Sequence, residues 1–81
     1  MAKVLLFGML ADAAGWRERT LAVLPATLSA LRDQLSADDP RLAEALSRRG
    51  VQAAVDKALV REDVGLAAAS EVAFLPPMSG G

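Results

Sequence analysis

A single apolar stripe in the middle of the chain restricts the fold most strongly. Leu28, Leu31 and Leu35 follow one another at the spacing of one face of an amphipathic helix. Thr27 precedes the stripe and predicts an N-cap, because its hydroxyl is free to accept a hydrogen bond from a backbone N–H. A helix of this kind has to bury its apolar face, so a second structural layer is expected from the flanking segments.

A second helix is predicted directly after the first. Asp39 is a candidate N-cap, and Pro40 would occupy the first helical position, where its missing N–H removes no hydrogen bond. Arg48 and Arg49 suit the last turn, because positive charge is favourable at a helix C-terminus. Gly50 is expected to end the helix.

Short apolar runs on both sides of the helices predict β-strands. The expected strands cover residues 3–9, 17–24, 51–55, 58–60 and 71–75. Asp56 and Lys57 predict a turn, and Leu66 is expected to anchor an irregular connection before the last strand. Pro76 and Pro77 end that strand, since proline has no N–H to donate. The order predicts the α+β class, a mixed sheet with helices packed on one face.

Composition excludes several classes of function. The net charge is −1, the basic residues are scattered, and the aromatic residues are one Trp and two Phe, so a nucleic-acid partner is not expected. The chain has no Cys and no His, which removes thiolate catalysis, His acid–base catalysis and nearly all zinc sites. We therefore expect no metal site.

The same sequence favours a cytoplasmic protein. The absence of Cys fits that compartment, and no apolar run approaches the roughly 20 residues of a membrane span. Residues 1–15 loosely imitate a signal peptide, but cleavage after them would delete the predicted first strand. We expect neither secretion nor a membrane partner.

Alternation along the strands predicts one face of the sheet that the helices do not cover. Glu71 and Lys3 are expected to be solvated and so mark this outer face. The apolar residues expected on it are Leu5, Phe7, Met9, Leu59, Ala73 and Leu75. An exposed apolar patch on a small protein marks a partner site. The alternative is a first strand buried on both faces, with Lys3 merely at its end, and the sequence leaves both open.

The C-terminal segment EVAFLPPMSGG, residues 71–81, carries a specific resemblance, supported by KVLLFGMLADAAG at residues 3–15, ALR at 30–32 and AVDKALV at 54–60. On these residues the chain resembles the small subunits of molybdopterin synthase, which are ubiquitin-like sulfur carriers and end close to DEVAFFPPVSGG. The resemblance implies a β-grasp domain over residues 1–77 and a flexible reactive tail over residues 78–81.

Three positions depart from the family pattern. Ala69-Ser70 stands where the family has Gly-Asp, Val55-Asp56 replaces Val-Asn, and Leu75 replaces the second aromatic residue of the Phe-Phe pair. Alanine tolerates a left-handed turn poorly, so the first departure predicts a different local geometry. The other two are milder, because Asp also favours turns and Leu keeps an apolar side chain.

The resemblance implies chemistry at the terminal carboxylate of Gly81. A ubiquitin-activating-like adenylyltransferase would use ATP to form an acyl-adenylate there, and a cysteine desulfurase or rhodanese-type donor would convert it to a thiocarboxylate. The large subunit would pass that sulfur to cyclic pyranopterin monophosphate. This chain would hold no cofactor and catalyse nothing alone, the catalytic residues lying on the large subunit of a heterotetramer of two large and two small subunits.

The remaining site residues follow from the same resemblance. Met78, Ser79 and Gly80 would insert with the tail into the partner, since glycine can pass through a narrow tunnel. The partner interface is expected to comprise Phe7, Leu59, Leu75, Pro76 and Pro77.

Other functions remain open at this stage. The chain could carry sulfur for another pathway, such as thiamin thiazole synthesis, or modify proteins by joining Gly81 to lysines. A plain interaction module, in which the terminal glycines are incidental, is a further alternative. Conjugate ladders in cell extract would indicate a modifier, and unchanged function after deletion of Gly81 would indicate a plain module.

Overall fold

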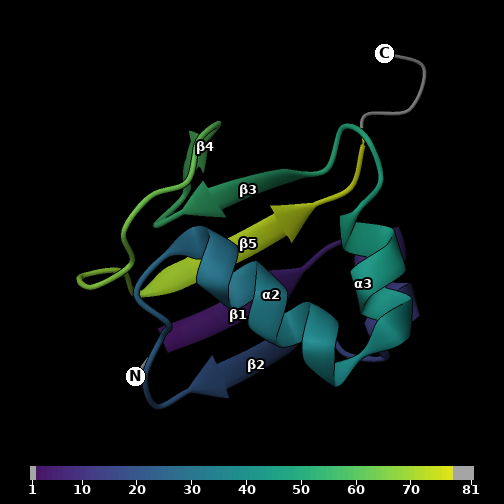
Figure 1. Ribbon diagram of the computed structural model, residues 1–81, viewed down its shortest axis with the longest axis horizontal. Helices are drawn as coiled ribbons and strands as arrows, with labels where there is room; N and C mark the ends of the chain where they lie inside the picture. Colours follow the sequence, from purple (N-terminus) through teal and green to yellow (C-terminus); the bar gives the residue numbers. More distant parts are fainter. Residues whose placement is uncertain (1, 78–81) are drawn as a thin grey trace.

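Both predicted helices begin at their predicted N-caps in the computed structural model, which describes residues 2–77 (Figure 1). The predicted end of the second helix at Gly50 is wrong, because the helix already ends at Leu46, and Arg48 and Arg49 lie outside its last turn. Helix α2 spans Leu28–Asp38, and the Thr27 hydroxyl accepts a hydrogen bond from the backbone N–H of Ala30 at 3.1 Å. Helix α3 spans Pro40–Leu46, with the Asp39 carboxylate accepting from the first backbone N–H groups. Local capping therefore decides where these helices begin.

Five strands form one mixed sheet. They are β1 (Ala2–Leu6), β2 (Glu18–Leu21), β3 (Gln52–Val55), β4 (Ala58–Val60) and β5 (Glu71–Leu75). Their order across the sheet is β2-β1-β5-β3-β4, with β1 parallel to β5 and every other pair antiparallel. The predicted turn between β3 and β4 is confirmed, since Asp56 and Lys57 have φ of 48° and 73°. The last strand in the sequence, β5, thus lies between β1 and β3.

The first strand was expected to continue to Met9, and this part of the prediction is wrong, because the strand ends at Leu6. Gly8 adopts φ 57° and breaks the extended backbone, and Met9–Ala14 forms helix α1. This segment consists largely of strong helix formers, and its Leu10 and Ala11 are buried. Gly15 ends the helix in a left-handed conformation, with its N–H donating to a helical carbonyl. Met9 therefore packs against the core rather than lying on the outer face of the sheet.

The second predicted strand is also shorter than expected. Residues 17–24 were predicted as a strand, and β2 ends at Leu21 because the chain bends before Pro25. Leu66, by contrast, is 1% exposed and anchors its connection as predicted.

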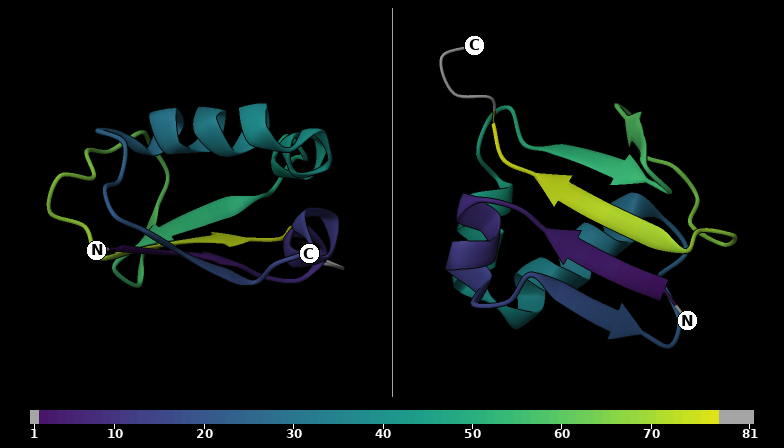
Figure 2. Two further views of the ribbon diagram at one scale, coloured as in Figure 1. Left: turned by 90° about the horizontal axis from the view of Figure 1, so that it is seen from below. Right: turned by 180° about the vertical axis from the view of Figure 1, so that it is seen from behind.

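The core lies between the sheet and one helical layer. Helices α2 and α3 lie on the same side of the sheet, and α1 lies beyond the end of β1 (Figure 2). The α2 stripe residues Leu28, Leu31 and Leu35 are buried against Val72 and Phe74 of β5, both 0% exposed. The helices cover one face only, so the opposite face is left for other contacts.

Candidate functional site

A continuous apolar row crosses the outer face of the sheet. The register places Leu5 beside Ala73, Ala73 beside Ala54, and Ala54 beside Leu59. Leu59 is 62% exposed and Leu5 is half-buried, whereas the small side chains of Ala54 and Ala73 are 8% and 7% exposed. No helix of residues 2–77 covers this row (Figure 2). The sheet thus presents an uncovered apolar strip reaching its β4 edge.

Phe7 and Leu75 lie where the parallel strands β1 and β5 end. The Phe7 N–H donates to the Phe74 carbonyl at 3.2 Å, which holds Phe7 beside Leu75. Phe7 is 46% exposed and Leu75 is half-buried. Lys3 is exposed on the same face, where its Nζ lies 3.8 Å from a Glu18 carboxylate oxygen, a weak surface pair. The first strand is therefore open on its outer face, and the alternative of burial on both faces is wrong.

The root of the tail packs against two glycines. A Cβ on Gly8 would lie 2.9 Å from Pro76 Cγ, and one on Gly50 would lie 3.1 Å from Pro77 Cβ. Real Cβ atoms essentially never approach another heavy atom to less than 3.0 Å. A side chain at Gly8 would therefore clash with Pro76, and one at Gly50 would be tight against Pro77, both prolines being half-buried.

These two glycines are the site residues that sequence reasoning missed. Gly8 was read as part of the first strand, and Gly50 only as the end of a helix. A glycine inside an apolar strand pattern signals a bulge or a close backbone approach, and that signal was available at Gly8. Nothing local indicates that the approaching residues are prolines at the other end of the chain.

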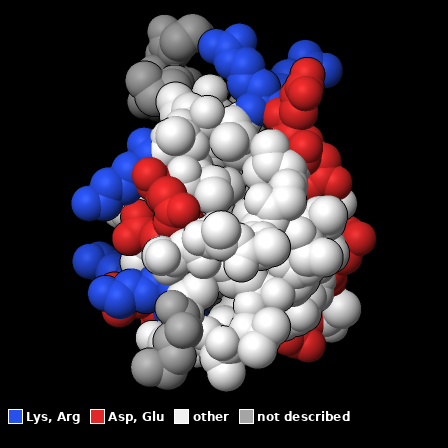
Figure 3. Space-filling model, turned by 90° about the vertical axis from the view of Figure 1, so that its left-hand side faces the viewer, with Lys and Arg blue, Asp and Glu red and all other residues white. Residues whose placement is uncertain are grey.

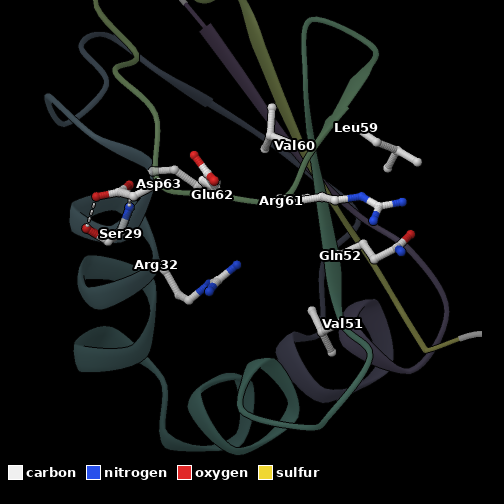
Figure 4. Close-up of a pocket in the computed structure, with 11 residues that line it drawn as sticks. Ser29, Arg32, Val51, Gln52, Leu59, Val60, Arg61, Glu62 and Asp63 are labelled. Atoms are coloured by element: carbon white, nitrogen blue, oxygen red, sulfur yellow. Dashed lines mark hydrogen bonds between the residues drawn. The ribbon is translucent and has the colours of Figure 1, made fainter.

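A separate groove lies between α2 and the β3–β4 edge (Figure 4). Its volume is about 500 Å³, and Arg32 extends into it from α2. Arg32 Nε is buried with no hydrogen-bond partner among residues 2–77, and its guanidinium lies 5.7 Å from the Phe74 ring centre. At the rim of this groove, the Asp63 carboxylate accepts hydrogen bonds from Ser29. Leu59 is the one predicted interface residue among its lining residues.

The end of the molecule opposite the tail root carries a broad patch without charge. Figure 3 shows a broad surface without charged side chains, with Lys, Arg, Asp and Glu at its margins. The loops after β2 and before β5 form this end, and they include Val23, which is 81% exposed. A charged substitution at Val23 would therefore lie far from Phe7 and Leu75.

Two further properties concern the described residues alone. No helix in residues 2–77 is long and apolar enough to cross a membrane. Within the same range, no group of three or more acidic side chains is placed to hold a metal ion. The predicted tail residues Met78, Ser79, Gly80 and Gly81 lie outside the described residues, so their roles stay predictions.

Comparison with known proteins shows which family this chain belongs to. The model of the ThiS family matches residues 4–81, which is nearly the whole chain. The chain belongs to the ThiS family. This ThiS-family chain is also 38% identical over 81 residues to the molybdopterin synthase sulfur carrier subunit of Escherichia coli strain K12, and the match covers all of both chains. The resemblance inferred from the C-terminal segment is thereby confirmed.

Solved structures support the fold of this ThiS-family chain. A crystal structure of SAMP1 from Haloferax volcanii matches with a TM-score of 0.77 and 25% identity, covering 99% of this chain and 98% of the other. A crystal structure of H. volcanii small archaeal modifier protein 1 gives 0.76 at 23% identity, covering 95% and 97%. The predicted α+β, β-grasp fold is confirmed, with α1 as an additional helix.

Proposed function

We propose that this chain is the sulfur carrier subunit of a molybdopterin synthase. One observation carries the proposal: the match to the E. coli sulfur carrier subunit spans both chains from end to end at 38% identity. It therefore includes the terminal segment on which the chemistry depends. Under this proposal the chain acts in the cytoplasm and binds the large subunit of the synthase.

The reaction would take place at Gly81. A free terminal carboxylate is ionised at neutral pH and is a poor electrophile. The activating enzyme would join it to the AMP portion of ATP, releasing pyrophosphate. A persulfide sulfur from a cysteine desulfurase or rhodanese-type donor would displace AMP, and a second thiol would cleave the resulting S–S bond to leave the thiocarboxylate. ATP is thus a substrate of the activating enzyme, and this chain itself holds no cofactor.

The large subunit would then catalyse sulfur transfer to cyclic pyranopterin monophosphate. Repeated transfer would build the dithiolene of molybdopterin and return the tail to a carboxylate. We place the catalytic residues on the large subunit and expect two large and two small subunits in the complex. The uncovered apolar strip, with Phe7, Leu59 and Leu75, is the surface we assign to docking.

The experiment exploits the absence of cysteine from the chain. The protein is incubated with ATP, the activating enzyme and a sulfur source, alkylated with a thiol reagent, and digested for mass spectrometry. We expect an adduct on the terminal peptide at Gly81. Peptide mapping is required, because replacing oxygen by sulfur nearly matches the mass of methionine oxidation at Met78. A chain lacking Gly81 is the control and should give no adduct. An unmodified wild-type peptide, with an activating enzyme proven on another carrier, would refute the proposal.

A second candidate function is protein modification. The H. volcanii protein of similar fold is named small archaeal modifier protein 1, and a modifier would share the adenylation step. The acceptor would then be a lysine amine rather than a pterin. Ladders of conjugates in cell extract would favour this candidate, whereas a thiocarboxylate consumed only by a pterin or thiazole acceptor would favour a carrier.

A further inference from the structure

Gly8 and Gly50 contact the tail root from opposite flanks. Strand β5 lies between β1 and β3, so its neighbours at the exit are the segment that follows β1 and the segment that precedes β3 (Figure 1). Gly8 belongs to the first segment and faces Pro76, and Gly50 belongs to the second and faces Pro77. The chain therefore leaves the sheet between two loops, with one proline packed against each.

Both contacts favour glycine for two reasons. Gly8 has φ 57° and Gly50 has φ 91°, conformations that other residues adopt only with strain. In addition, a Cβ at either position would press on a proline ring. Prolines hold their own φ near −65°, so a displaced ring changes the direction of the backbone that follows it.

Gly15 provides a comparison within the same chain. Its φ is 82°, but a Cβ built on it would meet no heavy atom within 4 Å. Gly15 therefore needs glycine only for its backbone conformation, as the end of α1. Substituting it tests the effect of a positive φ without touching the tail root, although its left-handed backbone with ψ 14° tolerates a side chain better than that of Gly8 with ψ −132°.

We propose that Gly8 and Gly50 are positioning residues that set the direction in which the C-terminal tail leaves the domain. This rests on the proposed function and extends it. Docking through the sheet face brings the carrier to an enzyme, but the reacting carboxyl carbon must also reach the site in the correct orientation. A misplacement of about 1 Å can lower a rate by about 100-fold. The two glycines act through Pro76 and Pro77 and touch no substrate.

The first test measures adenylation of the full chain. The variants are Gly8→Ala and Gly50→Ala, with Gly15→Ala as the matched control and Gly8→Ala combined with Pro76→Ala as the rescue. ATP–pyrophosphate exchange by the activating enzyme is followed against carrier concentration. We expect kcat to fall about 10- to 100-fold for Gly8→Ala and Gly50→Ala, with KM changed less than about threefold, because docking is retained. Gly15→Ala should keep the wild-type kcat. Because Pro76 is itself an expected interface residue, the double variant is compared with Pro76→Ala alone, and in that background Gly8→Ala should lower kcat far less than it does in the wild type.

The second test needs no enzyme. The Phe7 N–H donates to the Phe74 carbonyl beside the Gly8–Pro76 contact. Pressure on Pro76 should lengthen this bond, so amide exchange at Phe7 should accelerate at least threefold in Gly8→Ala and return toward the wild-type rate in the double variant. Gly15→Ala should leave it unchanged. If Gly8→Ala does not fold, Gly50→Ala carries the kinetic test, because its contact of 3.1 Å demands only a small shift.

The outcomes separate the two proposals. Wild-type protein that is never adenylated refutes the proposed function, and the exchange rate at Phe7 then decides whether the contact holds the tail root. Active wild type, with Gly8→Ala and Gly50→Ala equal to Gly15→Ala in kcat, refutes the positioning role alone. An equal loss of kcat on Gly8→Ala in the wild-type and Pro76→Ala backgrounds also refutes it.

Discussion

Asp63 accepts two hydrogen bonds from Ser29, one from the backbone N–H and one from the hydroxyl, each at 2.8 Å. Ser29 lies in the first turn of α2, so the pair ties the segment before β5 to the start of the main helix (Figure 4). The hydrogen bond from the Ser29 backbone N–H has the larger effect and the bond from the Ser29 hydroxyl the smaller one, and together they lower the pKa of Asp63 below its usual value of 3.8. Both bonds favour the ionised carboxylate.

This pair predicts a pH dependence of stability. Because the pKa of Asp63 is lower in the folded state, its contribution is present above the unfolded pKa of 3.8 and is lost as pH falls through the folded value. Denaturant unfolding between pH 7 and pH 2 should show a smaller loss of stability for Asp63→Asn than for the wild type. Ser29→Ala keeps the backbone donor and should fall between the two. Equal pH profiles for Asp63→Asn and wild type would contradict the assignment.

Asp56 stabilises the approach to β5. Its Oδ1 accepts from the N–H groups of Ser70 and Glu71 at 2.9 and 3.0 Å, and its own φ is 48°. Asp56→Ala should lower the free energy of unfolding by about 1–3 kcal/mol, because it removes both bonds and places Ala in a left-handed conformation. Asp56→Asn keeps an acceptor and tolerates that conformation, so it should lose less than about 1 kcal/mol. Urea unfolding measures both, and equal losses would show that the side-chain oxygen does not matter.

The apolar strip predicts where charge weakens partner binding. Leu59→Glu and Phe7→Glu should each raise the Kd for the large subunit about 30-fold, corresponding to about 2 kcal/mol at a buried interface position. Val23→Glu is the control, since Val23 is exposed and follows the end of β2 that pairs with the start of β1, whereas Phe7 follows the other end of β1. Calorimetric titration gives the affinities, and melting curves should be nearly unchanged for these exposed sites. An equal effect of Val23→Glu would place the interface elsewhere.

Phe74 and Leu75 are neighbours with opposite roles. Phe74 belongs to the core and is 0% exposed, whereas Leu75 is half-buried on the outer face. Phe74→Ala should cost about 3–5 kcal/mol of a total stability of about 5–15 kcal/mol, because it leaves a cavity under α2. Leu75→Ala should cost markedly less stability and weaken partner binding instead. Denaturant unfolding compares the two, and a larger stability loss for Leu75→Ala would reverse the assignment of faces.

Much of the local structure was determined by the sequence itself. Thr27 and Asp39 cap their helices, Asp56 and Lys57 form their turn, and Glu71–Leu75 forms β5 with the predicted alternation of faces. Each of these depends on hydrogen bonds or side-chain directions within a few residues, so a short segment contains the necessary information. The family could also be inferred, because the terminal segment is distinctive.

Tertiary structure decided the end of β1 and the form of the tail root. An apolar run at residues 3–9 fits a strand, and only the burial of Leu10 and Ala11 against the core shows that the chain turns at Gly8 and continues from Met9 as α1. The contacts Gly8–Pro76 and Gly50–Pro77 join segments from different parts of the chain. They exist because β5 inserts between β1 and β3, and no local propensity encodes which strands become neighbours.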